Sequence, residues 1–248
     1  MRAGPVLWRL AALVLLLVFI TKPQLFAFVF EPLTINNAPA IYNQGSLFSL
    51  TLAHLGTVFS AALASTIIAV TLGIFVTRPS GLEFLALSRS LVNIGQTFPP
   101  IAVLAIAVPL VGFGEKPTLI ALFLYGLLPI FENTLSGLTQ VSPLTLEAAK
   151  GMGMSPRRRL IEVELPLALP VILAGIRLSV VINLGTATIG STVAAKGLGE
   201  VIIAGLQSNN MAFILQGGLV VALLAVLISD ALMSVERFAA RKLGQAPS

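Results

Sequence analysis

Few residues in this sequence are of types that perform covalent or metal chemistry. The 248 residues include no cysteine and one histidine, His54, so neither a thiolate nucleophile nor a two-histidine metal site can form. No lysine follows a glycine anywhere in the chain, which excludes the glycine-rich phosphate-binding loop of ATP-hydrolysing domains. We therefore expect no catalytic residue and no metal ligand here, and any energy from ATP must come from a partner.

The segment 141–170 has the most distinctive pattern of polar residues. Its two Ser-Pro pairs, Ser142-Pro143 and Ser155-Pro156, each combine a good N-cap with a proline that suits the first helical position. They predict two short helices, at roughly 143–150 and 156–164. Leu165-Pro166 and Pro170 are expected to mark the start of the next apolar helix.

These two short helices carry residues suited to contact with another protein. Adjacent alanines in Glu147-Ala148-Ala149 would allow close approach, and Gly151 and Gly153 suit a tight turn because glycine tolerates positive φ. A rigid helix-turn-helix favours docking over tethering. The alternative is an amphipathic loop whose Arg157-Arg158-Arg159 only marks the cytoplasmic side, and for the arginines alone this is the better interpretation.

The composition indicates an integral membrane protein of one domain. Hydrophobic residues make up 56% of the chain and charged residues 10%, whereas soluble domains have roughly 25% charged residues. The net charge of +5 comes from residues placed between apolar runs rather than in an aromatic-rich patch, which argues against nucleic-acid binding. A span needs roughly 20 apolar residues, and six are expected, at roughly 5–21, 49–76, 88–110, 117–137, 166–189 and 211–235.

Two of these spans raise questions of their own. Pro99 and Pro100 interrupt the third span, so its early part is expected to be broken or to line a cavity. The first resembles the start of a signal peptide, but no small-x-small cleavage site follows it, so a retained helix is favoured.

Lysine and arginine positions predict the orientation. With both termini in the cytoplasm, eleven of these residues lie inside and three, Lys22, Lys116 and Lys196, lie outside. Arg177 falls within a span. The inside residues are Arg2, Arg9, Arg78, Arg89, Lys150, Arg157, Arg158, Arg159, Arg237, Arg241 and Lys242.

The sequence divides into three parts: a first helix with an outside loop at 1–48, a core at 49–235 and a cytoplasmic tail at 236–248. The outside loop 22–48 is proline-rich and reads as ordered but irregular. The segment 190–210 is too apolar for a solvated loop, which predicts a short re-entrant or interfacial helix.

Charged residues inside spans need partners. Arg177 is expected to pair with Glu132 or with Asp230, although both acids lie near helix ends and could instead snorkel to the interface. His54 is expected to be packed or hydrogen-bonded rather than to relay protons.

The loop pattern resembles the cytoplasmic motif of ABC importer permeases. That motif is EAA, three residues, glycine, nine residues and Ile-x-Leu-Pro. Here Glu147-Ala148-Ala149, Gly153 and Val163-x-Leu165-Pro166 match it at every spacing, with valine in place of isoleucine. The runs 95–109, 164–177 and 182–188 are similar to permeases for glycine betaine, choline and related osmoprotectants, and the likeness covers roughly 45–235.

This resemblance implies an all-α type I importer transmembrane domain of about six helices in the bacterial cytoplasmic membrane. The loop 142–165 would contact a cytoplasmic ATPase, which would bind the ATP and Mg²⁺. A periplasmic or lipid-anchored binding protein would deliver the solute, and a second permease, identical or related, would complete the pathway. The coupling residues would be Glu147, Ala148, Ala149, Gly153, Arg157, Arg158, Leu165 and Pro166.

Polar residues within the spans are the candidates for the pathway, because polar groups facing lipid are costly. A quaternary ammonium cannot donate hydrogen bonds but is attracted to aromatic faces. The alternative is that these residues only pack between helices. The polar candidates are Asn93, Gln96, Thr97, Asn183, Thr186 and Thr188, and the aromatic ones are Phe98, Phe113 and Tyr125.

Other function classes remain open at this point. The chain could be an ABC permease for another small solute. A stand-alone channel or ion-coupled carrier would call for mid-membrane acids and inverted repeats, and neither is evident. An intramembrane enzyme would need a paired set of reactive residues deep in the spans, which His54 alone does not supply.

Overall fold

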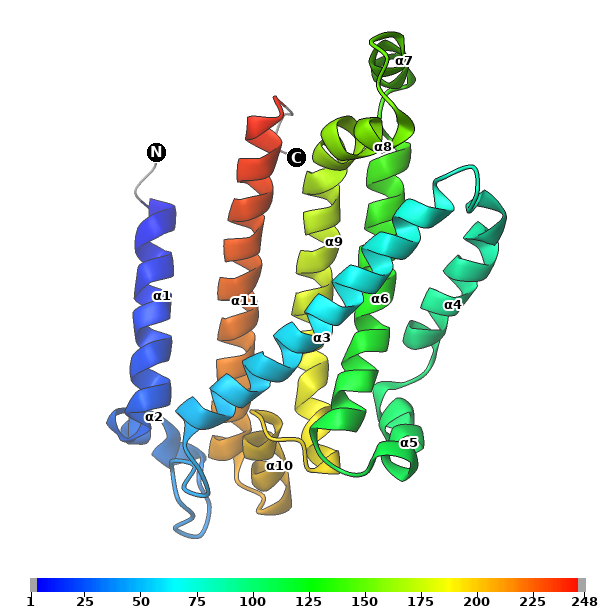
Figure 1. Ribbon diagram of the computed structural model, residues 1–248. Helices are drawn as coiled ribbons and strands as arrows, with labels where there is room; N and C mark the ends of the chain where they lie inside the picture. The colour runs from blue at the N-terminus through cyan, green and yellow to red at the C-terminus, as the bar shows by residue number, and fades with distance from the viewer. Residues whose placement is uncertain (1–3, 245–248) are drawn as a thin grey trace. The chain divides into compact units, whose positions relative to one another are not determined.

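The structure is a computed structural model that describes residues 4–244, with side chains from residue 7 onward. The described residues are helical almost throughout and include no strand (Figure 1). The longer helices are α1 (Gly4–Thr21), α3 (Leu47–Val76), α6 (Glu115–Thr139), α9 (Leu165–Thr186) and α11 (Met211–Lys242). The shorter ones are α2 (Ala27–Phe30), α4 (Leu85–Thr97), α5 (Pro100–Val111), α7 (Pro143–Gly151), α8 (Pro156–Arg159) and α10 (Gly199–Gln207).

Tighter or wider helical turns connect several of these elements. The 3-10 segments are Pro23–Phe26, Glu31–Leu33, Leu82–Phe84 and Ala187–Val193. One π-helical segment, Leu160–Glu164, lies between α8 and α9.

Among the described residues, four helical stretches are long and apolar enough to cross a membrane: Leu47–Val76, Glu115–Thr139, Pro156–Val193 and Met211–Lys242. Two bent pairs qualify when each counts as one span, namely Leu7–Thr21 with Pro23–Leu33 and Leu82–Thr97 with Pro100–Val111. Each of the six predicted spans therefore has a counterpart.

The predicted break at Pro99-Pro100 is confirmed. The chain bends by 96° between α4 and α5. Phe98 and Pro99 have extended backbone, with ψ of 137° and 140°, because a residue that precedes proline is disfavoured in the helical region. The short helix expected within 190–210 is also found, as α10.

The predicted boundary at Leu165-Pro166 coincides with the start of α9 at Leu165, but the helical backbone is continuous across it, from Pro156 to Val193. The backbone N–H of Leu165 bonds to the carbonyl of Leu160, five residues back. This π turn shifts the hydrogen-bond ladder by one residue just before Pro166, which has no N–H to donate. The helix accommodates the proline instead of ending there.

The chain forms two compact units, and the four long spans contribute residues to both. Within the described residues, the first unit comprises 4–61, 99–122 and 181–228, and the second comprises 62–98, 123–180 and 229–244.

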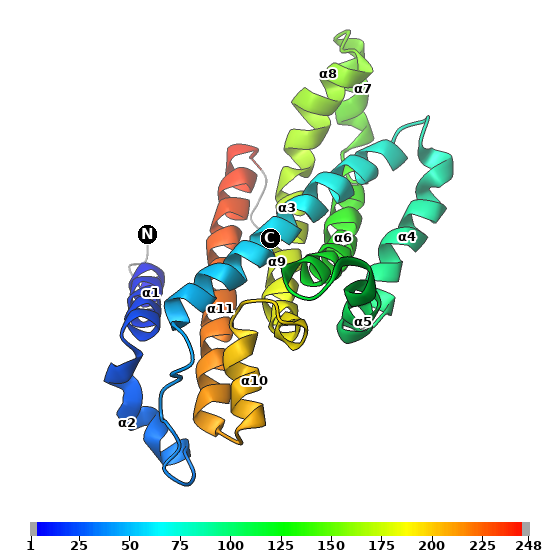
Figure 2. The ribbon, with the colours of Figure 1, turned by 60° about the horizontal axis from the view of Figure 1, so that its bottom comes forward.

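The first unit is organised around the first half of α11. α10 lies beside the first turns of α11 (Figure 2). The two helices approach closely at Gly205 of α10, where an added Cβ would lie 2.7 Å from the backbone nitrogen of Ile214. The buried side chain of Gln216 donates to the carbonyl of Ala40 at 2.7 Å and accepts from the N–H of Tyr42 at 3.1 Å. These bonds fix the irregular loop before α3 to α11.

The core of the second unit lies between α6 and α9. A Cβ on Gly175 would lie 2.7 Å from the carbonyl oxygen of Pro129, so the two backbones can meet only because this residue has no side chain. Phe131 and Ile130 are fully buried beside this contact. This packing fixes the end of α6, which leads to α7, and the start of α9, which follows α8.

Candidate coupling loop and translocation residues

α7 extends beyond the ends of α6 and α9 in the second unit (Figure 1). Glu147 and Ala148 are exposed on it, but Ala149 is only 2% exposed and packs against its own chain. Neighbouring residues on a helix point about 100° apart, so only one alanine of the pair can face a partner. The expectation that both alanines form the outer surface therefore does not hold for Ala149.

The exposed face of α7 includes two large apolar residues that the sequence reasoning missed. Leu144 is 76% exposed and Met152, just past the end of the helix, is 72% exposed. With Ala148 they stand at positions i, i+4 and i+8, which share one helix face. The same spacing is visible in the sequence. We call Leu144, Ala148 and Met152 the α7 face.

The turn after α7 depends on Gly153, whose φ is +78°. Its N–H bonds to the carbonyl of Lys150 at 2.9 Å, and the next N–H, of Met154, bonds to the carbonyl of Ala149 at 3.2 Å. Gly151, by contrast, is the last residue of α7 and is absent from the positive-φ residues. The prediction of a glycine-dependent turn is thus confirmed at Gly153 only.

Alanine at these two glycines should have opposite effects. A Cβ at either position would meet no atom within 4 Å, so only backbone conformation matters. Gly153→Ala forces a left-handed conformation at about 1–2 kcal/mol, whereas Gly151→Ala favours the helix by up to about 1 kcal/mol. Hydrogen exchange of the 148–155 amides should accelerate about 5- to 30-fold in Gly153→Ala and stay level or slow in Gly151→Ala. Equal rates in both variants would contradict the turn geometry.

The start of α8 fits the predicted cap only in part. The hydroxyl of Ser155 accepts from the N–H of Arg158 at 3.3 Å, but the side chain of Ser142 makes no such bond to α7. Pro143 nevertheless occupies the first turn of α7, where its missing N–H costs little.

The arginines of α8 differ in their surroundings. Arg158 forms an exposed pair with Glu162 at 2.9 Å, one turn away. Arg157 is exposed and forms no ion pair with another described residue. Arg159 is more buried and contacts Glu164 through its Nε at 3.1 Å.

Glu164 is the centre of a buried ion cluster that sequence reasoning did not find. Its side chain is 4% exposed and lies 2.6 Å from Nη2 of Arg78, which follows α3, as well as near Arg159. Two cations on one carboxylate compensate for its removal from water. We call Arg78, Glu164 and Arg159 the arginine clamp, which joins the end of α3 to the base of the loop. Leu165 packs into the apolar cluster of Leu138, Ala168 and Ile172 at the same level.

The second unit brings several pathway candidates together. The side chain of Gln96 donates to the carbonyl of Tyr125 at 3.2 Å, and the hydroxyl of Tyr125 donates to the carbonyl of Phe98. Thr97 bonds back to the carbonyl of Asn93 at 3.0 Å. Asn93, Gln96, Thr97 and Phe98 are all exposed, in the last turns of α4 and at its C-terminus.

The first unit contains the remaining candidates. Thr186 and Thr188 bond back to the carbonyls of Ile182 and Gly185, and Phe113 is exposed after α5. Asn183 is fully buried, and neither of its side-chain polar atoms hydrogen-bonds with another described residue. Such a group costs about 1–3 kcal/mol.

Replacement of Asn183 by leucine should therefore stabilise the protein. Leucine has a similar size and removes the unsatisfied amide, so we expect the thermal unfolding midpoint to rise, in line with about 1–3 kcal/mol. If the amide serves the pathway, transport should fall in the same variant. A lowered midpoint in detergent-purified protein would show that the amide has a stabilising partner.

The charged residues inside spans have other partners than predicted. Arg177 contacts Glu236 at 3.1 Å, an acid that was not considered, and Glu132 pairs with Arg89 at 2.7 Å, so the predicted Arg177–Glu132 pair is wrong. In the first unit, His54 is buried and its Nε2 lies 3.0 Å from the carbonyl oxygen of Leu184. This matches the expected packed and hydrogen-bonded histidine.

Comparisons with known proteins identify the family. The family model for the binding-protein-dependent transport system inner membrane component matches residues 69–244. The chain is 39% identical to the osmoprotectant import permease protein OsmY of Salmonella typhimurium, over 72% of this chain and 76% of that protein. It is 40% identical to the choline transport system permease protein OpuBB of Bacillus subtilis, over 79% of this chain and 89% of that one.

Solved structures agree on the fold. An inward-facing MetNI methionine ABC transporter chain matches with a TM-score of 0.70 at 22% identity, over 78% of this chain and 95% of that chain. Together with the family match and the apolar spans, this makes the protein a multi-pass permease of the inner membrane and not an enzyme. The chain belongs to the family of binding-protein-dependent transport system inner membrane components, the permease subunits of ABC importers.

Proposed function

We propose that this permease carries a quaternary-amine osmoprotectant, such as glycine betaine or choline, into the cell, driven by a partner ATPase. The relatives at about 40% identity are named for osmoprotectant and choline transport. Their similarity extends over most of both chains, which supports a shared solute class.

The α7 face supports the second half of this proposal. An exposed leucine and methionine beside an exposed alanine form an apolar surface at the tip of a rigid loop, as expected of a docking element. The ATPase would bind ATP and Mg²⁺, and a binding protein would deliver the solute on the other side. A second permease, identical or related, would complete the pathway.

We place the pathway along two groups of the candidate residues. Gln96, Phe98 and Tyr125 cluster in the second unit, and aromatic faces attract a cation that cannot donate hydrogen bonds. Asn183, Thr186 and Thr188 are the polar candidates in the first unit.

Reconstituted transport tests the solute class. The permease, its ATPase and its binding protein in proteoliposomes should accumulate labelled glycine betaine, choline or carnitine only when ATP is enclosed. ATP-driven uptake of a different solute, with none of the quaternary amines carried, would assign another ABC importer substrate. Uptake without the ATPase would favour a channel or ion-coupled carrier.

A further inference from the structure

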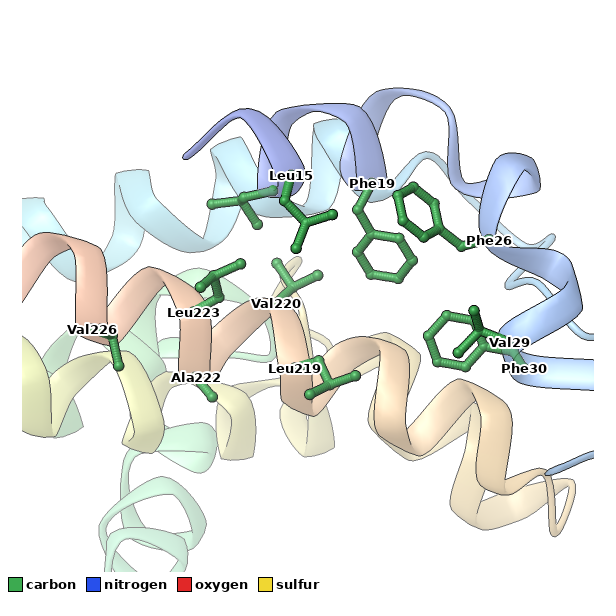
Figure 3. Close-up of a pocket in the computed structure, with 11 residues that line it drawn as sticks. Leu15, Phe19, Phe26, Val29, Phe30, Leu219, Val220, Ala222, Leu223 and Val226 are labelled. Atoms are coloured by element: carbon green, nitrogen blue, oxygen red, sulfur yellow. The ribbon is translucent and has the colours of Figure 1, made fainter. Parts of the chain in front are cut away.

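The first unit contains an apolar pocket of about 480 Å³ between its N-terminal segment and α11 (Figure 3). Leu15 and Phe19 of α1, Phe26 of the following turn, and Leu219, Ala222 and Val226 of α11 are among its lining residues, and every lining residue is apolar. The volume lies in the range of roughly 300–1,000 Å³ typical of small-molecule sites. A wholly apolar lining offers nothing to orient a polar solute.

The pocket is formed by helices that cross the membrane. α11 qualifies as a span, and α1 does so together with the segment that follows it. The exposed residues Leu215, Leu219, Ala222 and Val226 follow one face of α11, and all but the first line the pocket. The medium beside such a face is hydrocarbon, not water.

The segment after α1 forms one end of the pocket. The chain bends by 108° after α1 and continues as helical turns through Leu33. The ring of Phe19 packs against Phe26, with 5.1 Å between the two ring centroids, and against Phe30, with 5.6 Å between them. Leu25 and Phe28 of the same segment are exposed. A short helical segment that is apolar on both faces is expected where protein or hydrocarbon, rather than water, surrounds it.

The bend also carries a charge, at the end of α1 where a membrane span would meet the lipid headgroups. Lys22 is exposed and directly follows α1, and it is the sole charged residue between Arg9 and Glu31. An ammonium group in this position complements a phosphate. Exposed Glu31 follows Phe30, so the two charges balance and should not select for anionic over zwitterionic headgroups.

We propose that this pocket binds one acyl chain of a membrane phospholipid, with the headgroup phosphate beside Lys22. The chain would fill the space between α1 and α11 and fix the N-terminal helix to the first unit. Residues 1–68 lie outside the region matched by the family model, so one wall of this site would belong to the N-terminal segment, whereas the α11 wall lies within the matched region.

The single tryptophan, Trp8, allows a direct test. With Trp8 replaced by phenylalanine, Phe26→Trp introduces one tryptophan in the pocket, whose fluorescence reports lipid binding there. Phe59→Trp in the same background is the control, because Phe59 is exposed on α3 in the first unit but does not line the pocket. A phospholipid with brominated acyl chains is titrated into the detergent-purified full-length protein, and tryptophan quenching is followed.

Quenching of Phe26→Trp should saturate at about one lipid per protein, at a concentration about tenfold below that needed for Phe59→Trp. Ala222→Phe or Val226→Phe fills the pocket and should abolish this saturating quenching at low lipid concentration, which we call the early phase. The thermal unfolding midpoint of the protein should stay constant. Lys22→Ala should weaken the early phase for the phospholipid but not for a brominated fatty-acid methyl ester. Equal, non-saturating quenching at both reporters would overturn the proposal. The proposal would also be overturned if a second copy of the chain covered the pocket and excluded lipid from it. In that case Phe26→Trp would show no quenching in the dimer.

Discussion

Glu164→Ala is expected to lower the thermal unfolding midpoint sharply and to abolish transport. The substitution removes the carboxylate shared by Arg78 and Arg159, whose side chains are each only 25% exposed. The two cations would then face each other with no compensating charge, and the loss of one partner from a buried pair costs about 3–5 kcal/mol. Thermal unfolding in detergent and ATP-driven uptake in proteoliposomes measure the two effects.

Glu162→Ala is the matched control for this prediction. Glu162 lies two residues earlier in the same π segment and pairs with Arg158 at 2.9 Å, but both side chains are exposed. Exposed pairs contribute about 0.2–1 kcal/mol or nothing measurable, so Glu162→Ala should behave almost like the parent protein. If the two variants lose equal stability, the arginine clamp does not stabilise the loop.

A conservative variant separates a positioning role from simple stability. Arg78→Lys keeps the positive charge but loses the guanidinium geometry that reaches both Thr77 and Glu164. If the clamp positions the loop, this variant should fold and yet couple ATP hydrolysis to uptake poorly. Full coupling at parental stability in Arg78→Lys would restrict the clamp to a structural role.

Leu144→Asp is expected to abolish transport without destabilising the permease. The side chain is 76% exposed, so its replacement leaves no cavity. A charge within an apolar docking surface would be buried without a partner on binding, which costs about 3–5 kcal/mol. Association with the ATPase should therefore weaken by more than about tenfold. Co-purification of the tagged permease with its ATPase and uptake in proteoliposomes provide the readouts.

Leu82→Asp controls for the addition of negative charge on the same side of the membrane. Leu82 is also an exposed leucine of the second unit, in a loop predicted to be cytoplasmic, but it is not part of α7. This variant should retain ATPase binding and uptake. Equal loss of binding in both variants would remove the special role given to the α7 face.

The features that were predictable from sequence depend on local rules. Ser155-Pro156 and Gly153 specify a cap and a turn through the conformations of single residues, and Pro99-Pro100 breaks a span for the same reason. The continuous helix through Pro166 was missed because a neighbouring π turn changes what proline costs. That compensation is not visible in the residue types.

The arginine clamp could not be predicted because its partners are far apart in the chain. Arg78 and Glu164 are separated by 86 positions, and Arg177 and Glu236 by 59. Several acids were plausible partners for each arginine, and only tertiary packing selects one. The α7 face, in contrast, could have been predicted from the sequence. Leu144, Ala148 and Met152 are spaced four residues apart, which places them on one side of a helix.

Site-specific cross-linking tests the central claim that α7 docks on the ATPase. The chain has no native cysteine, so Ala148→Cys introduces a single thiol on the α7 face, and Leu206→Cys on α10 places one on the predicted outer side. In membranes that contain the assembled transporter, we expect a short thiol-reactive cross-linker to join Ala148→Cys to the ATPase, more strongly in one nucleotide state than in another. Leu206→Cys should give no such product. Labelling of Ala148→Cys by a membrane-impermeant maleimide added to intact cells, with no ATPase cross-link, would contradict the account.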